Sequence, residues 1–238
     1  MRYGSLALGT IVLSLALARP AAATPLILNG GFESGTTDWT LLNQAGSSGG
    51  TYLQSGTTSP LTGFTVPAPP QGSFALMTDQ SAPGSHIFYQ DFVVPFGVTS
   101  AAFSYEYFIG NQAGAFSTPN TLDYTVVPNQ QARVDFITTA ADPFSVAPGD
   151  VLLNVGNTPV GTVFPNAYSL FSADLTSFLQ AHQGQTLRLR FAEVDNQDFF
   201  NAGLDAVNLN VTSAPEPATL LLLGTGLVAA GRRFTRRA

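Results

Sequence analysis

Short β-prone runs, separated by turns rich in glycine and proline, constrain the fold of this chain more than any other feature. Residues 101–109 alternate, with an aromatic or aliphatic side chain at every second position. Residues 186–192 alternate in the same way, so that Leu187, Leu189 and Phe191 would face a core and the intervening arginines would face outward. A period of two is typical of strands that bury one face. We therefore predict an all-β fold, an antiparallel sandwich or jelly roll.

Other segments extend this pattern along the chain. Strands are predicted at residues 26–28, 73–78, 86–94, 131–138, 151–155 and 204–211, and long loops at residues 44–70 and 110–120. One short helix is predicted at residues 172–179, with Ser172 as its N-cap and apolar residues at helical spacing from Leu175 onward. Gly184 would end the helical segment.

The N-terminus has the three parts of a secretory signal peptide. Arg2 gives a basic start, residues 6–18 form an apolar run, and residues 21–23 supply three alanines for a signal peptidase. The run is shorter than the roughly 20 residues that a membrane span needs. We therefore expect residues 1–23 to be removed, an N-terminal anchor helix being the alternative. Residues 24–213 then form a single domain by the usual size of domains.

Charge is distributed unevenly along the chain. Six of the nine basic residues, all arginines, lie in the two end segments, which leaves 9 − 6 = 3 in the middle: Arg133, Arg188 and Arg190. Of fifteen acidic residues only Glu216 lies in the tail, which leaves 15 − 1 = 14, so the middle carries 3 − 14 = −11. A domain this acidic is a poor partner for nucleic acid, whose phosphates need a basic face. Disulfides are excluded because the chain has no cysteine.

A third segment, residues 214–238, ends the chain. It has a Pro-Glu-Pro triplet, an apolar run and a terminal arginine cluster: Pro215, Glu216, Pro217, Arg232, Arg233, Arg236 and Arg237. At 1.5 Å per residue, a helix over residues 218–230 would span about 20 Å, less than the roughly 30 Å of the bilayer core. The arginines would stay on the cytoplasmic side. The segment is therefore a marginal membrane anchor.

This order of parts resembles the PEP-CTERM sorting signal. The resemblance implies transient membrane association, recognition by an exosortase-type membrane protease, and delivery to the cell surface or to an extracellular polysaccharide matrix. A plain tail anchor is the alternative.

Short motifs in the middle of the chain also occur in a recognisable order. NGGFESG at residues 29–35 opens the domain and GLDAVNL at residues 203–209 closes it. The order resembles the galactose-binding-like jelly-roll superfamily, which includes many carbohydrate-binding modules. The resemblance implies a structural calcium ion held by Glu33 and Asp205 with backbone carbonyls. Ala206 stands where a second acid is common, which removes one carboxylate. The alternative is that the two acids only accept hydrogen bonds from turn amides.

Groups suited to catalysis are sparse. His86 and His182 are isolated in the sequence, and no nucleophile, metalloprotease or phosphate-binding motif is present. Glu193 and Asp195 would share one face of a strand and could act as the paired carboxylates of a glycoside hydrolase, or be ordinary solvated acids at a strand end. We therefore expect no catalytic residues and no enzyme, with a glycoside hydrolase as an alternative.

Sugar binding needs exposed aromatic faces beside polar groups. Trp39, the single tryptophan, is expected to pack in the core. Phe199 and Phe200, between Asp198 and Asn201 in a predicted loop, are the candidate ligand-binding aromatics. We predict an exported, non-enzymatic protein of the cell surface or extracellular matrix. A carbohydrate-binding module for an extracellular polysaccharide is the alternative.

Overall fold

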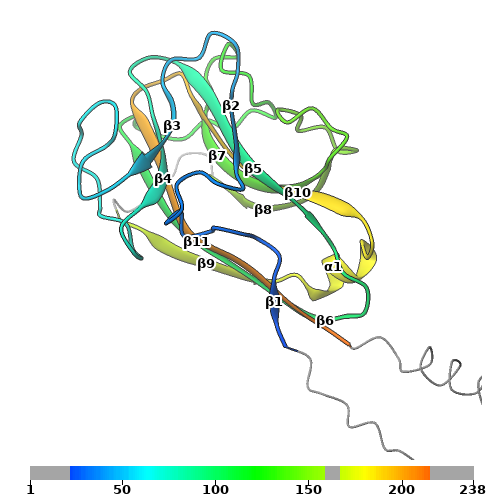
Figure 1. The fold of residues 1–238 in the computed structure, drawn as a ribbon. Coiled ribbons are helices and arrows are strands. Elements are labelled where there is room, and N and C mark those ends of the chain that lie inside the picture. The colour runs from blue at the N-terminus through cyan, green and yellow to red at the C-terminus, as the bar shows by residue number, and fades with distance from the viewer. Residues whose placement is uncertain (1–21, 159–166, 215–238) are drawn as a thin grey trace, which may run out of the picture. The chain divides into compact units, whose positions relative to one another are not determined.

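The computed structural model describes residues 22–158 and 167–214, and these form a two-sheet antiparallel β-sandwich with one short helix (Figure 1). The compact unit is Ala23–Ala214. The predicted all-β, antiparallel class is confirmed. No helix within the described ranges is long and apolar enough to cross a membrane. The predicted signal peptide and sorting helix lie outside the described residues.

The first sheet, here sheet A, has the strand order β3-β4-β11-β6-β9, with β1 also paired to β11. Its strands are β1 (Thr24–Pro25), β3 (Gly50–Gln54), β4 (Ala75–Asp79), β6 (Val98–Asn111), β9 (Ser169–Asp174) and β11 (Phe200–Ser213). The second, sheet B, has the order β2-β5-β10-β7-β8. Its strands are β2 (Thr40–Asn43), β5 (Gly84–Val93), β7 (Gln130–Thr138), β8 (Val151–Asn157) and β10 (Thr186–Asp195). The helix is α1 (Thr176–Ala181).

The predicted alternation places the core between the two sheets. Leu187, Leu189 and Phe191 of β10 are buried against the inward residues of β6. The rings of Tyr105 and Phe191 meet edge to face with centroids 5.3 Å apart. Trp39 is buried in the same cluster, as predicted. Interlocked rings of this kind account for much of the area buried in a sandwich core.

The arginines of β10 lie on the outer face of sheet B, as predicted, and a loop covers this face around Arg190. Arg190 is fully buried, because Phe144 and neighbouring loop residues pack over the sheet. Its guanidinium donates to the carbonyl oxygens of Pro143 and Ser145, both at 2.7 Å, and to the carboxylate of Asp135. A charged group can be buried here because all of these partners accept its hydrogens.

Three element boundaries differ from the predictions. The helix begins at Thr176, because Ser172 continues β9 and pairs with Ser104 of β6. The predicted loop 44–70 contains strand β3, which pairs with β4. Residues 26–28 form bends and no strand. In each case pairing with a distant strand, which the local sequence does not encode, decides the outcome.

Both ends of the described domain lie at one pole, here called the terminal pole (Figure 1). Thr24 pairs with Val211, and the Ala214 amide donates to the Gly97 carbonyl at 2.7 Å. Strand β11 has 14 residues and so leads roughly 40 Å away from this pole. The opposite end, here the distal pole, consists of the connections at residues 44–49, 80–83 and 196–199.

Candidate functional site

A polar cluster occupies the interior at the distal end of the sandwich. The inward alternation of β10 continues past Phe191, so that Glu193 and Asp195 point between the sheets. Only 1% of Glu193 and 4% of Asp195 is exposed. The side-chain amide of Gln80 donates to both, at 3.0 Å to Glu193 Oε1 and 3.1 Å to Asp195 Oδ2. The two acids are not solvated as ordinary strand-end acids would be.

Several buried polar atoms of this cluster have no hydrogen-bond partner among the described residues. They include Gln80 Oε1, and also Glu193 Oε2 and His86 Nε2, which have only the Thr78 side chain and the Ser48 carbonyl beside them and no well-formed hydrogen bond. His86 lies opposite Glu193 in the β5–β10 ladder, and its Nδ1 is 2.8 Å from Asn43 Oδ1. An unpaired buried acceptor costs about 1–3 kcal/mol. Several of them together mark this end of the interior as a place where polar groups have not been optimised for stability.

Burial sets the protonation of these groups. It raises the pKa of Glu193 well above its ordinary value, and the neighbouring charge of Asp195 adds to the effect. It raises the pKa of Asp195 to about 7, against the opposing hydrogen bond from Gln80. It also lowers the pKa of His86 to about 4, which the Ser48 carbonyl partly offsets. Near neutral pH, Glu193 therefore holds its proton, His86 is neutral, and Asp195 is close to its midpoint.

The cluster is reached from solvent through a small pocket at the distal pole. Gln80 and Asp195 line this cavity of about 230 Å³, together with Asn196, Asp198 and Phe199. Two of these five side chains are carboxylates and two are amides, so the pocket offers hydrogen-bond acceptors and negative charge.

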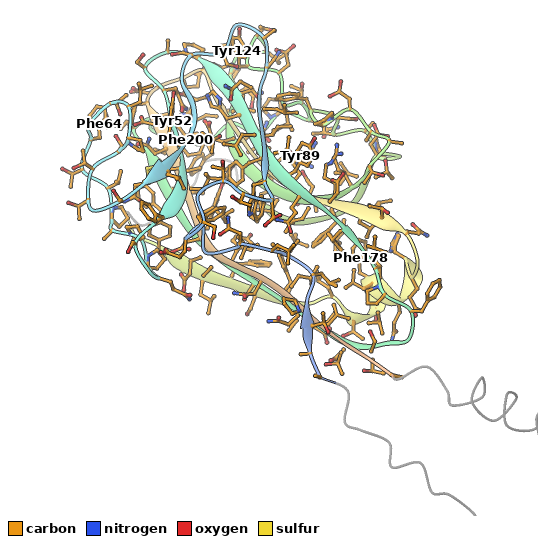
Figure 2. The ribbon with its side chains drawn as sticks, in the orientation of Figure 1. Tyr52, Phe64, Tyr89, Tyr124, Phe178 and Phe200 are labelled. Carbon is orange, nitrogen blue, oxygen red and sulfur yellow. The ribbon has the colours of Figure 1, made fainter. Side chains whose placement is uncertain are left out.

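Phe199 also lines a second cavity on its other side. That cavity, of about 310 Å³, includes Phe64, Asn111 and Gln112. The rings of Phe64 and Phe199 lie 4.2 Å apart between centroids, and 44% of Phe64 is exposed. In Figure 2 Phe64 lies on the side of the molecule away from Phe178 of helix α1. The two rings are here called the aromatic ledge; Phe199 lines both cavities, and Phe64 lines the second.

The expectation of exposure is wrong for Phe200. Its ring is fully buried and packs on Phe116 with centroids 5.8 Å apart. Strand β11 begins at Phe200, and the alternation turns this ring inward while its neighbour Phe199 stays partly exposed. Phe64 was missed, although a large aromatic residue in a loop rich in Gly, Ser and Thr is a usable signal of exposure.

A hollow on the outer face of sheet A is also a candidate for binding because of its size. This shallow hollow is lined by small or polar residues of β6, β9 and β11, among them Ser100, Ala102 and Asn210. Phe103, the one ring among the residues that line it, is only 1% exposed. Among the described residues, this hollow therefore presents no exposed ring of the kind that stacks on sugars.

The two predicted calcium ligands lie on either side of one short segment, residues 71–74. Glu33 Oε1 accepts two amide hydrogens from this segment, at 2.8 and 3.0 Å, and Asp205 Oδ2 accepts one at 3.1 Å. Burial raises the pKa of Asp205 to about 6, and the charges of Glu33 and Glu106 raise it further. Within residues 22–158 and 167–214, no three His, Cys, Asp or Glu side chains gather as a metal-ligand group. Both acids accept hydrogen bonds from turn amides, which is what the alternative to calcium binding predicts.

A family model for the PEP-CTERM protein-sorting motif matches residues 213–237, so the chain carries this sorting motif at its C-terminus. No curated protein matches the chain.

Several solved β-sandwich structures are similar to the domain. One is TmCBM61 in complex with beta-1,4-galactotriose, at 10% identity over 78% of this chain and 97% of that chain, with a TM-score of 0.44. Another is a Stig cyclase from Fischerella sp. TAU, at 13% identity over 82% and 100% of the two chains, with a TM-score of 0.45. A third is an adhesin domain of Lys-gingipain from Porphyromonas gingivalis, at 10% identity over 78% and 96%, with a TM-score of 0.44. Likenesses this distant assign no ligand.

The raised pKa of Asp195 predicts a stability that falls with pH. The folded protein holds this proton up to about pH 7, whereas an ordinary Asp loses it near 3.8, so ionisation costs stability as the pH rises between these values. Asp195→Asn removes the cost. At pH 8 the variant should be more stable than the unchanged protein, by on the order of 3 kcal/mol, and the gain should vanish near pH 4.

Urea unfolding of both proteins between pH 4 and 8 measures this difference. Glu193, Asp198 and His86 lie near Asp195, and because the charge of Asp195 raises the pKa of Glu193, part of the measured difference passes through Glu193. Asp38→Asn is the matched control, because it removes one charge from an exposed residue at φ 71°, a conformation that Asn tolerates. A pH-independent difference for Asp195→Asn would contradict the assignment.

Proposed function

We propose that this chain is an exported, non-enzymatic protein of the cell surface or extracellular matrix, and that its sandwich binds an extracellular polysaccharide at the distal pole. The PEP-CTERM motif supports export, sorting to the cell surface and processing by an exosortase. The apolar run at residues 6–18 supports an earlier cleavage by signal peptidase. Membrane attachment through residues 218–230 would then be transient, because the segment is short for a span.

One observation carries the binding part of the proposal. The aromatic ledge of Phe64 and Phe199 lies at the pole opposite to Ala214, and Phe199 lines both a polar cavity and a second cavity of mixed character. Partly exposed rings beside amides and carboxylates are what sugar rings require: an apolar face to stack on and polar groups for the hydroxyls. A domain tethered through the terminal pole would present the ledge outward, toward the matrix.

The non-enzymatic part is supported by the burial of the one acid pair that resembles glycosidase carboxylates. A glycoside hydrolase needs two carboxyl groups that flank the sugar bond. Glu193 is 1% exposed and shares the Gln80 amide with Asp195, so a sugar bond cannot lie between the two acids. The remaining histidine, His182, bonds the Phe178 carbonyl of α1 through Nδ1.

Processing of the tail predicts a defined new C-terminus. Cells producing the protein would be fractionated, and the C-terminus of the mature form would be determined by mass spectrometry. We expect a surface or matrix form that lacks Arg232, Arg233, Arg236 and Arg237, because these residues follow the Pro-Glu-Pro triplet. An intact tail that ends in arginine and persists in the membrane fraction would show a plain tail anchor.

Glycan binding is tested by removing the ledge. Phe199→Ala and Phe64→Ala should each weaken retention on the bound polysaccharide about tenfold, since one aromatic stacking contact contributes roughly 1–1.5 kcal/mol. A glycan array identifies the polysaccharide, and affinity electrophoresis measures the variants.

Phe96→Ala is the matched control for the ledge. It removes a ring that is 74% exposed, adjacent to Gly97 at the terminal pole, and should leave retention unchanged. If no glycan binds the unchanged protein, the chain is a surface protein without carbohydrate recognition, and the binding part of the proposal fails.

Structural calcium at Glu33 and Asp205 is a second proposal, favoured by charge. Asp205 is buried beside the charges of Glu33 and Glu106, which raise its pKa, and none of the three carboxylates forms a salt bridge among the described residues. A divalent cation held by these oxygens and by backbone carbonyls would offset the repulsion. Backbone amides already donate hydrogen bonds to Glu33 and Asp205. The two carboxylates therefore do not by themselves complete a set of calcium ligands.

Calcium should therefore raise the melting temperature of the purified protein by several degrees, relative to the same protein with a chelator. Glu33→Gln should reduce this shift, because Glu33 is exposed and its loss leaves the core intact. Identical melting temperatures with calcium and with chelator would exclude the metal.

A further inference from the structure

The polar pocket at the distal pole needs an occupant that donates hydrogen bonds. Gln80 is fully buried and lines the pocket, and its Nε2 is used by the two acids while its Oε1 has no partner among the described residues. A carbonyl oxygen and an ionised carboxylate accept hydrogens and cannot supply them.

The pocket also lacks positive charge. Its wall contains the carboxyl groups of Asp195 and Asp198. The arginines of the described domain are engaged elsewhere: Arg133 and Arg190 with Asp135, and Arg188 with Asp91. No basic side chain lines the pocket. A neutral, water-like occupant would satisfy the free acceptors but would leave the charge of Asp195 uncompensated.

We infer that this pocket binds a primary ammonium group, carried by an amino sugar of the polysaccharide. An ammonium group has three donors and no acceptor, which matches the Asp195 carboxylate and Gln80 Oε1, the two buried acceptors in the wall of the pocket. Binding exchanges the proton of Asp195 for the ligand's charge. The inference rests on the proposed function, since it names the sugar that the aromatic ledge would hold.

Size and placement agree with a single sugar ring. The cavity of about 230 Å³ is smaller than the roughly 300–1,000 Å³ typical of drug-sized ligands, so it admits one ring at most. Phe199 forms the wall between this pocket and the neighbouring cavity. A chain of sugars lying across the aromatic ledge would therefore place one residue in the acidic pocket and the next against Phe64.

The test compares three tetrasaccharides that differ in one substituent: β-1,4-linked glucosamine, its N-acetylated form and the corresponding glucose oligomer. Isothermal titration of the purified full chain in mild detergent gives each affinity. The glucosamine oligomer should bind about tenfold tighter than the other two, because only it forms charge-assisted hydrogen bonds with Asp195. Asp195→Asn should abolish this preference. The variant is expected to fold, because it removes a destabilising charge.

The outcomes separate the two proposals. Equal binding of all three oligomers, lost in Phe199→Ala, would overturn the ammonium site and leave polysaccharide binding intact. A preference for glucosamine that survives in Asp195→Asn, or is equally reduced in Asp38→Asn, would show attraction to the acidic surface in general and would also overturn it. If the protein binds none of the oligomers and no glycan on the array, both the ammonium site and the proposed polysaccharide binding fail.

Discussion

Three arginines must serve fourteen acids in this domain, and that shortage shapes much of the structure. Two of them bond the same carboxylate: Arg133 and Arg190 both donate to the buried Asp135. Arg190 also donates to two carbonyls of the loop that covers sheet B, so one guanidinium ties the loop to the sheet. Arg188 pairs with Asp91 and lies 3.9 Å over the ring of Tyr89. The cations therefore organise one sheet face and leave none for the distal pole.

Acids outside these pairs accept hydrogen bonds from backbone amides, and these bonds fix the loops that carry the candidate site. Asp79, fully buried, accepts the amides of Leu61 and Thr62 at 2.6 and 2.9 Å. Asn201 at the start of β11 donates to the same carboxylate at 3.2 Å. These bonds fix the loop in which Phe64 stands, and they join it to the strand that follows Phe199. The Asp79 carboxylate, which forms no salt bridge among the described residues, thus fixes the loop that carries part of the aromatic ledge.

The sequence predicted the parts of this structure that depend on local periodicity. Alternation identified β6 and β10 and the side chains that they direct into the core. The same alternation, continued three residues beyond Ala192, places Glu193 and Asp195 between the sheets as well. Phe200 could not be assigned in this way, because its direction depends on whether β11 begins before or after it. Phe64 could not be placed at all, since a contact with Asp79, 15 residues later in the chain and on another element, decides the course of its loop.

A sandwich of this size would be more stable with apolar residues in place of Gln80, Glu193 and Asp195. Hydrophobic replacement of buried polar groups is often neutral or stabilising, and here the acceptors are not fully paired. The middle of the same inter-sheet space is densely packed, since the rings of Phe88 and Phe191 stack with their centroids 5.5 Å apart. At the distal pole Gln80 Oε1 is unpaired, and the interior opens there into a pocket. A ligand that supplies donors and positive charge at this end would offset the cost that the fold carries there, and that dependence is the physical reason to look for recognition at the distal pole.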